Sequence, residues 1–340
     1  MDNTITVKMI SMEDIINAGC FDIGGTVSII EKALAAHKNG KILLPDKISQ
    51  VFDEATQNRI NCMPATLVDE KICGVKWVSV FPENPMLHGC PNVSGIIILS
   101  ELERGYPFAA MDATFLTALR TACVGALASK HLARNDSRVI GLIGSGEQAK
   151  MHLIAMKHVH PEISICRVAS RSAENSRRFI EGMSERFPEI EFSDCASDYD
   201  MAASDADIIV TAVSCQAPLL KASSVKPGAF YCHVGGWEDE YEVPLKADKI
   251  VCDSWESVKH RTQTLSRLWQ AGRLKDEDIY ADLEDIADGT KLGRENDREF
   301  IYFNSVGLSF IDIAVAADFC RRSLAKGLGT DWRMKASPVI

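Results

Sequence analysis

The stretch RVIGLIGSG, residues 138–146, constrains the fold of this chain more than any other. An apolar run of β character ends in Gly144, Ser145 and Gly146, and an amphipathic stretch follows at 150–160. This pattern is typical of the strand, tight turn and helix of a dinucleotide-binding unit with the spacing G-x-G-x-x-A. Gly144 permits the sharp turn, Gly146 lets the backbone approach a pyrophosphate, and the free N–H groups at the helix start suit phosphates. The residues expected to bind the cofactor here are Gly144, Ser145, Gly146, Glu147, Gln148 and Ala149.

Beyond the glycine turn the sequence alternates between β and helical patterns. The expected strands are 138–143, 166–169, 190–192, 207–213, 229–234 and 249–252, and the expected helices are 150–160, 173–186 and a long one at 256–274. Alternation over this length predicts an α/β fold with a parallel, doubly wound sheet. In such a sheet the ligand binds at the carboxyl ends of the strands.

The chain before residue 135 is organised differently. Helices are expected at 27–38 and 115–132, and between them the expected strands are 59–63, 71–80, 94–99 and 107–111. Strands that follow one another without helices predict an antiparallel or mixed sheet, separate from the dinucleotide-binding domain. The last stretch, 300–324, contains a strand, a turn and a helix whose apolar spacing would let it pack back on this first domain.

Composition narrows the classes of function. The net charge of -10 and the lack of Lys/Arg blocks argue against a nucleic-acid or anionic membrane surface. No secretory signal or apolar run of membrane-spanning length is found. The 11 cysteines are dispersed without a C-x-x-C pair, which indicates reduced thiols in a cytoplasmic protein rather than a disulfide framework or a zinc site. No metal is expected, and a small molecule is the expected partner.

The residues after the second strand bear on the choice of dinucleotide. An NAD site would place an Asp or Glu here for the ribose 2′-hydroxyl, but this chain has Ser170, Arg171 and Ser172. Their hydroxyls and the guanidinium could meet a 2′-phosphate, since Arg offers planar, charged donors to phosphate oxygens. NADP(H) is therefore favoured over NAD(H), and the alternative is that Arg171 only caps a surface turn.

Five stretches together resemble the ornithine cyclodeaminase and mu-crystallin family. They are Gly74-Val75-Lys76-Trp77, Tyr106-Pro107, Met111-Asp112 followed by Leu116 to Ala122, the glycine turn, and Asn304 to Leu308. The resemblance implies a substrate-binding and dimerisation domain of α+β type from both chain ends, 1–134 and 305–340, and a Rossmann dinucleotide-binding domain at 135–304. It also implies a homodimer and hydride transfer in amino-acid or imine chemistry.

Individual roles follow from the resemblance position by position. Arg120 matches the arginine that grips the substrate carboxylate, and Lys76 matches a lysine that serves as acid/base or carboxylate partner. Lys47 and Met63 correspond to substrate-pocket positions. The further positions expected to border the cofactor are Thr121, Thr211, Ala212, Val213, Ser214, Val234, Gly235, Ser305 and Gly307. His233 is interpreted as a core histidine.

One departure from the family bears on the reaction. Ornithine cyclodeaminases carry a catalytic aspartate where this chain has Trp237, which cannot accept a proton. Glu238 is then the candidate for proton transfer, and this loop, like Asn84-Pro85, resembles the N-(2-amino-2-carboxyethyl)-L-glutamate dehydrogenase branch of 2,3-diaminopropionate biosynthesis. The sequence thus favours an oxidoreductase of the Cα–N bond of an amino acid or opine-like amino acid. Ornithine cyclodeaminase, ketimine reductase and an NADP-binding mu-crystallin-like protein remain alternatives.

Overall fold

The computed structural model describes residues 4–53 and 55–335. Two compact units divide the chain, one made of the residues up to Arg120 and from Leu308 onward, the other of Thr121–Gly307. The division falls inside helix α4 (Thr114–Leu132), whose last residue lies two positions before the expected boundary at 134/135. The first unit is called the α+β unit below, and the second the nucleotide unit.

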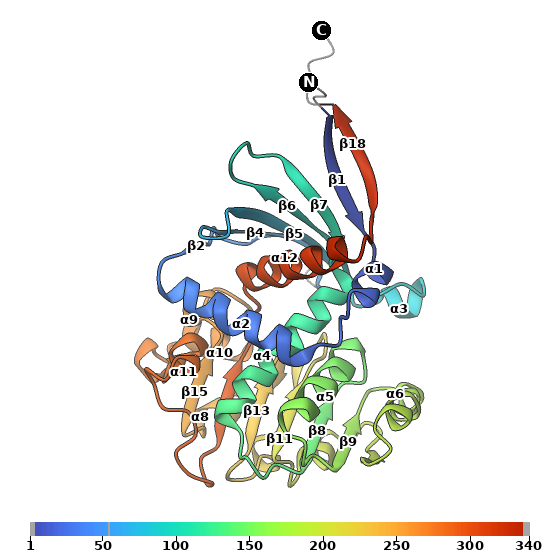
Figure 1. The fold of residues 1–340 in the computed structure, drawn as a ribbon. Helices are drawn as coiled ribbons and strands as arrows, with labels where there is room; N and C mark the ends of the chain where they lie inside the picture. The colour runs from blue at the N-terminus through green and yellow to red at the C-terminus, as the bar shows by residue number, and fades with distance from the viewer. Residues whose placement is uncertain (1–3, 54, 336–340) are drawn as a thin grey trace. The chain divides into compact units, whose positions relative to one another are not determined.

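The α+β unit is built on an eight-stranded sheet of order β18-β1-β7-β6-β5-β4-β2, with β3 paired to β4. Its pairs are antiparallel except β1 with β7, so the expected mixed sheet is confirmed. The two ends of the described chain pair with each other as β1 and β18 (Figure 1). The strands are β1 (Thr4–Ile10), β2 (Ile42–Leu43), β3 (Ile48–Asp53), β4 (Asn58–Leu67), β5 (Ile72–Val80), β6 (Val93–Glu101), β7 (Pro107–Asp112) and β18 (Thr330–Lys335).

Helix α12 (Ser309–Ala325) packs on this sheet and α2 (Ile23–Lys38) packs on α12 (Figure 1). Alternating residues of β4 and β6, such as Ala65 and Ile97, are buried under them. Helix α12 therefore packs against elements from the first part of the chain, as its apolar spacing predicts. Two shorter helices, α1 (Met12–Asn17) and α3 (Asn84–Leu87), complete the unit.

The nucleotide unit contains an eight-stranded sheet of order β10-β9-β8-β11-β13-β17-β15-β16, parallel throughout. The expected doubly wound parallel sheet is confirmed. From β8 the chain continues outward through β9 and β10 on one side, and β11 then lies on the other side of β8, so the strand order reverses there. The strands are β8 (Val139–Ile143), β9 (Ile165–Ala169), β10 (Glu191–Asp194), β11 (Ile208–Thr211), β13 (Phe230–His233), β15 (Lys249–Cys252), β16 (Ala281–Asp282) and β17 (Ile301–Asn304), with β12 (Gln216–Leu220) and β14 (Trp237–Asp239) in a separate two-stranded sheet.

The helices of this unit are α5 (Glu147–Val159), α6 (Ala173–Arg186), α7 (Tyr199–Ala203), α8 (Glu242–Leu245), α9 (Trp255–Val258), α10 (Thr264–Gln270) and α11 (Leu283–Ala287). Two of the three helices expected in this unit are present as α5 and α6, the third is not, and the short helices α7, α8 and α11 were not expected. The long helix expected at 256–274 is wrong, because the chain turns between α9 and α10. Gln263, at the start of α10, uses its side chain to bind the backbone of Gly235 and Ser305 instead of continuing a helix.

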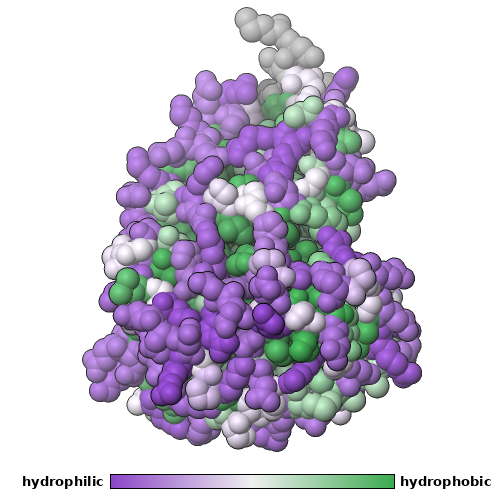
Figure 2. Space-filling view, turned by 60° about the horizontal axis from the view of Figure 1, so that its bottom comes forward, coloured by the Kyte–Doolittle hydropathy of each residue, from purple (hydrophilic) through white to green (hydrophobic). Residues whose placement is uncertain are grey.

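Within residues 4–53 and 55–335, no helix is both long and apolar enough to cross a membrane. On the face drawn in Figure 2, hydrophilic residues predominate and hydrophobic ones lie in patches among them. All 11 cysteines are free, and seven of them are buried, namely Cys20, Cys123, Cys166, Cys195, Cys232, Cys252 and Cys320.

Candidate active site

The glycine turn joins β8 to α5 with the geometry that the motif predicts. Gly144 has φ +118°, and a Cβ there would lie 2.9 Å from the carbonyl oxygen of Ala212, so only glycine fits without strain. A Cβ on Gly146 would meet nothing within 4 Å, which leaves the space in front of the helix start open. Ala149 is buried against the strand side, and the side-chain oxygen of Gln148 is buried with no hydrogen-bond partner among the described residues. Glu147, in contrast, is exposed and pairs with Lys150.

The end of β9 presents two serines and an arginine. Ser172 caps α6 by accepting a hydrogen bond from the N–H of Asn175, while the Ser170 hydroxyl accepts one from the N–H of Ser172. Arg171 is exposed between them. No acidic side chain occupies these three positions, and the only charged residue among them is a cation.

A buried carboxylate organises the ends of β11 and β13. Glu238 has no exposed surface, and it accepts hydrogen bonds from the Thr211 hydroxyl (2.6 Å), the N–H of Val213 (2.6 Å) and the N–H of Gly235 (2.8 Å). Burial raises its pKa to about 7, and these three donors act in the opposite direction. The expected cofactor residues Thr211 to Ser214, Val234 and Gly235 therefore lie in two backbone segments that share one side chain.

Next to Glu238 lies a second group of buried titratable side chains. Nε2 of His233 is 3.6 Å from a Glu238 oxygen and 3.4 Å from an Asp239 oxygen. Burial lowers the pKa of His233 to about 4 and raises that of Asp239 to about 8, so the histidine is neutral here and stays in the core, as its alternation in the strand predicts. The Thr264 hydroxyl donates to Asp239.

A third buried carboxylate holds the turn after β17. Asp253 accepts hydrogen bonds from the Ser305 hydroxyl (3.0 Å) and from the N–H groups of Val306 (2.9 Å) and Gly307 (2.7 Å). The side chain of Gln263 then bridges the carbonyls of Gly235 (2.6 Å) and Ser305 (3.2 Å). Sequence reasoning selected Ser305 and Gly307 but missed Asp253 and Gln263, although an acid directly after the buried strand β15 is a recognisable signal.

In the α+β unit, Lys76 and Arg120 share one carboxylate. The Asp312 Oδ1 atom accepts from Lys76 Nζ (2.7 Å) and from Arg120 Nε (2.8 Å), and all three side chains are buried. Nη1 of Arg120 and Oδ2 of Asp312 have no hydrogen-bond partner among the described residues. Burial, together with the charge of Arg120, lowers the pKa of Lys76 to about 8 against the opposing effect of Asp312.

The remaining expected residues lie around this cluster or outside it. Met63 is buried and stands opposite Lys76 in the register of β4 and β5. Lys47 immediately precedes β3, and the first residue of that strand, Ile48, pairs with Cys62. Thr121 follows Arg120 in α4 and is buried. Sequence reasoning missed Asp312, for which the signal was an acid inside the apolar stripe of α12.

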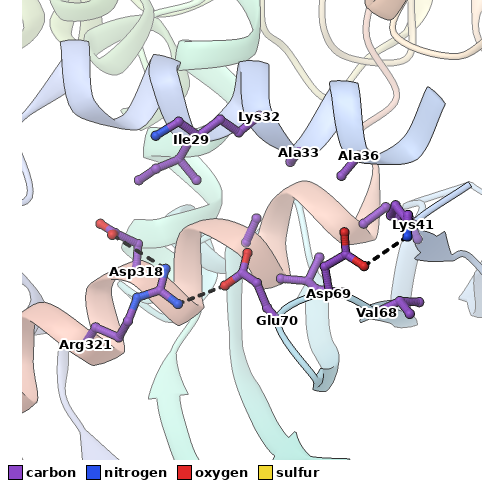
Figure 3. A pocket seen from close by; sticks show the side chains of 13 residues that line it. Ile29, Lys32, Ala33, Ala36, Lys41, Val68, Asp69, Glu70, Asp318 and Arg321 are labelled. Carbon is purple, nitrogen blue, oxygen red and sulfur yellow. Dashed lines mark hydrogen bonds and ion pairs between the residues drawn. The ribbon is translucent and has the colours of Figure 1, made fainter. Parts of the chain in front are cut away.

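A separate cavity of about 190 Å³ opens on the α+β unit between α2, α12 and the turn after β4 (Figure 3). Several of its charged residues form ion pairs, as in Lys41 with Asp69 (3.3 Å) and Arg321 with Glu70 (2.8 Å). None of the expected site residues lines it. Among the described residues, no group of three or more His, Cys, Asp or Glu side chains is arranged to hold a metal ion.

Known proteins are similar to this chain over most of its length. The model of the ornithine cyclodeaminase/mu-crystallin family matches residues 8–326. N-((2S)-2-amino-2-carboxyethyl)-L-glutamate dehydrogenase of Staphylococcus aureus is 29% identical over 308 residues, which cover 89% of this chain and 91% of that protein.

Two solved structures are similar over almost their whole length. The Δ1-pyrroline-2-carboxylate reductase of Thermococcus litoralis, in complex with NADH and L-proline, has a TM-score of 0.90 at 31% identity, covering 95% of this chain and 99% of that one. An archaeal alanine dehydrogenase dimer with bound NAD has a TM-score of 0.86 at 30% identity, covering 96% and 99%.

Proposed function

Because the chain belongs to the ornithine cyclodeaminase/mu-crystallin family, we propose that it is a nicotinamide-dependent oxidoreductase acting on the Cα–N bond of an amino acid or an N-substituted, opine-like amino acid. The buried cluster of Lys76, Arg120 and Asp312 carries this proposal. Two cations and one anion leave a net charge of +1 when Lys76 is protonated, and an unpartnered Arg120 nitrogen is available to a carboxylate.

Arg120 and Lys76 have separate roles in the proposed reaction. The Arg120 guanidinium holds the substrate carboxylate and so fixes the orientation of the adjacent Cα–H bond. A bound nicotinamide would supply the hydride chemistry at this carbon. Lys76, with a pKa near neutrality, gives up or takes the proton at the substrate nitrogen or at the water that hydrolyses the imine. Oxidation thus yields an imine, a reduced nicotinamide and one proton, and hydrolysis of the imine yields an oxo acid and an amine.

The loop at Trp237 favours net oxidation or reduction over cyclodeamination. Trp237 stacks on Tyr241, with ring centroids 5.6 Å apart, and the Arg267 guanidinium lies 4.7 Å from the centre of its indole. The two acids that follow, Glu238 and Asp239, are fully buried. This loop segment therefore offers no exposed carboxylate to an ornithine side-chain amine, the role that the resemblance gives to the aspartate of cyclodeaminases.

A substrate screen with both nicotinamides tests the proposal. We expect a net change in the absorbance of reduced nicotinamide with an amino acid, an N-carboxyalkyl amino acid such as N-(2-amino-2-carboxyethyl)-L-glutamate, or a cyclic imine. Turnover of ornithine to proline without a net change in cofactor would refute it in favour of the cyclodeaminase. Tight cofactor binding without turnover across the panel would instead support a mu-crystallin-like binding protein.

For the cofactor we propose NADP(H), on the basis of Ser170, Arg171 and Ser172. A guanidinium and two hydroxyls suit a 2′-phosphate, and an acid that would repel it is missing from these positions. Titration should show tighter binding of NADPH than of NADH, and Arg171→Ala should weaken NADPH binding while leaving NADH binding unchanged. Arg177→Ala, on the next turn of α6, is the matched control. Tighter binding of NADH to the unmodified protein would contradict the preference.

We also propose a homodimer formed through the outer face of the α+β sheet. Trp77 and Ile96 stand opposite each other on β5 and β6 and are 46% and 50% exposed, and Ile98 on the same face is 40% exposed. The two helices of this unit that pack together, α2 and α12, cover other residues of the sheet. A contiguous apolar sheet face of this kind is typical of a protein interface.

A further inference from the structure

One buried side chain joins two strand ends of the nucleotide unit. β11 and β13 are neighbouring parallel strands in which Thr211 pairs with His233, and the chain leaves both at the same edge of the sheet. Oε1 of Glu238 accepts the N–H of Val213, beyond β11, and Oε2 accepts the N–H of Gly235, beyond β13. The Thr211 hydroxyl donates to Oε2 as well. The carboxylate therefore ties together the two backbone segments that continue beyond the paired strands.

The backbone at Gly235 packs closely against this carboxylate. A Cβ on Gly235 would lie 2.2 Å from Oε1 of Glu238 and 2.3 Å from the carbonyl oxygen of Val213. The chain after β13 comes this close only because residue 235 is glycine. If the carboxylate were removed, the N–H groups of Val213 and Gly235 would lose their acceptor beside a buried position, which is costly.

The position of these segments relative to the cofactor follows from the strand order. A doubly wound sheet binds a dinucleotide across the point where the order reverses, with one mononucleotide on each side. Here the pyrophosphate turn ends β8, the ribose residues Ser170 to Ser172 follow β9 on one side, and β11 and β13 lie on the other. The nicotinamide half of the cofactor is therefore expected to lie against the two segments that Glu238 holds.

We propose that Glu238 is a positioning residue for hydride transfer, which fixes the two backbone segments bordering the nicotinamide and through them the orientation of its ring. This inference rests on the proposed nicotinamide-dependent function. It assigns Glu238 a place behind the cofactor, since the side chain has no exposed surface and its donors Thr211, Val213 and Gly235 belong to the protein itself. Direct proton transfer to substrate is then left to Lys76.

Glu238→Gln is the test variant, because it keeps the shape and replaces one acceptor oxygen by an NH₂ group that faces a backbone N–H. Asp207→Asn is the matched control. Asp207 is also a buried carboxylate that accepts two backbone N–H groups, those of Arg138 (2.8 Å) and Val139 (3.0 Å). Arg138 precedes β8 and Val139 is its first residue, so both lie at the amino edge of the same sheet, where no cofactor is expected.

The readout compares a complete cofactor with a fragment. Dissociation constants are measured for the preferred reduced nicotinamide dinucleotide and for ADP-ribose or its 2′-phosphate, which lack the ring. We expect Glu238→Gln to weaken binding of the complete cofactor by about tenfold and to lower kcat, with fragment binding within about twofold of the unmodified protein. Asp207→Asn should lower thermal stability and change neither constant.

A second pair of variants guards against misfolding of Glu238→Gln. Thr211→Val removes one of the three donors and should weaken cofactor binding less, whereas Thr211→Ser keeps the hydroxyl and should restore it. Equal losses for cofactor and fragment, or no loss for either, would overturn the inference. If the unmodified protein binds no nicotinamide at all, the proposed function itself fails, and this outcome is distinct from the previous two.

Discussion

At the scale of single residues, the most informative feature is the unequal charge of the buried cluster in the α+β unit. One carboxylate oxygen of Asp312 pairs with both Lys76 and Arg120, and its other oxygen has no hydrogen-bond partner among the described residues. A buried charge without a counter-ion is expensive, so this arrangement favours either loss of the Lys76 proton or the arrival of an anion. A carboxylate substrate is an anion of the required charge, and its binding would in turn raise the pKa of Lys76.

Replacing the guanidinium by an amine tests the role of Arg120. Arg120→Lys keeps the charge but loses the planar pair of donors, so KM for the substrate should rise about 10- to 100-fold, corresponding to about 1.5–3 kcal/mol. Cofactor affinity should stay the same. Arg321→Lys, an exposed arginine on α12, should change neither quantity. Steady-state kinetics with cofactor titration measures both, and an unchanged KM in Arg120→Lys would exclude this arginine from carboxylate binding.

The pH profile tests Lys76 and Asp312 together. Protonated Lys76 attracts the substrate carboxylate, so kcat/KM should fall as pH rises through about 8, where the lysine loses its proton. Asp312 acts to keep that proton, and Asp312→Asn should therefore move the alkaline limb to lower pH. Asp318→Asn, on the same helix but outside the cluster, should leave the limb in place. An alkaline limb that does not move in Asp312→Asn would rule out this coupling.

The sequence alone predicted two of the three residues in the buried cluster of Lys76, Arg120 and Asp312. Lys76 and Arg120 stand out because each interrupts an apolar pattern within a recognisable motif. Asp312 lies 192 residues from Arg120 and 236 from Lys76 along the chain. Asp312 reaches Lys76 and Arg120 only because α12 packs on the sheet. A pattern within one segment cannot predict a contact between residues so far apart in the sequence.

At the scale of elements, the two glycines of the β8–α5 turn serve different purposes and can be separated by experiment. Gly144→Ala meets both the positive φ and the carbonyl of Ala212, so it should cost about 1–3 kcal/mol of unfolding free energy and also impair cofactor binding. Gly146→Ala meets open space, so its stability should stay within about 0.5 kcal/mol.

Cofactor affinity should nevertheless fall in Gly146→Ala, because the added methyl group occupies the approach of the pyrophosphate. Urea unfolding and cofactor titration measure the two effects separately. A Gly146→Ala protein that binds the cofactor as tightly as the unmodified protein would place the phosphates elsewhere.

The elements that sequence predicts well are those with a strong local period. Helix 173–186 has the bounds that its pattern predicts, and so does strand 249–252. β3 was missed because every residue in it is exposed and no alternation results. The helix expected at 256–274 failed because a tertiary contact, the binding of Gln263 to two distant carbonyls, overrides local propensity.

At the scale of the whole molecule, the exposed sheet face predicts the oligomer. The unmodified protein should sediment at twice the chain mass of 37.4 kDa. Trp77→Glu places a charge in the apolar face and should shift the protein to the monomer. Leu292→Glu, at a residue that is 61% exposed in the nucleotide unit, should remain a dimer. Analytical ultracentrifugation distinguishes these outcomes, and a Trp77→Glu dimer would move the interface to another surface.

The pairing of β1 with β18 also determines the order in which a growing chain can fold. The nucleotide unit is continuous from Thr121 to Gly307, whereas the sheet of the α+β unit needs strands from both chain ends. During synthesis from the N-terminus, Lys76 and Arg120 emerge long before Asp312. Until α12 docks, these two cations have no common partner, and a chain that stops before this helix would lack the carboxylate that lets them be buried together.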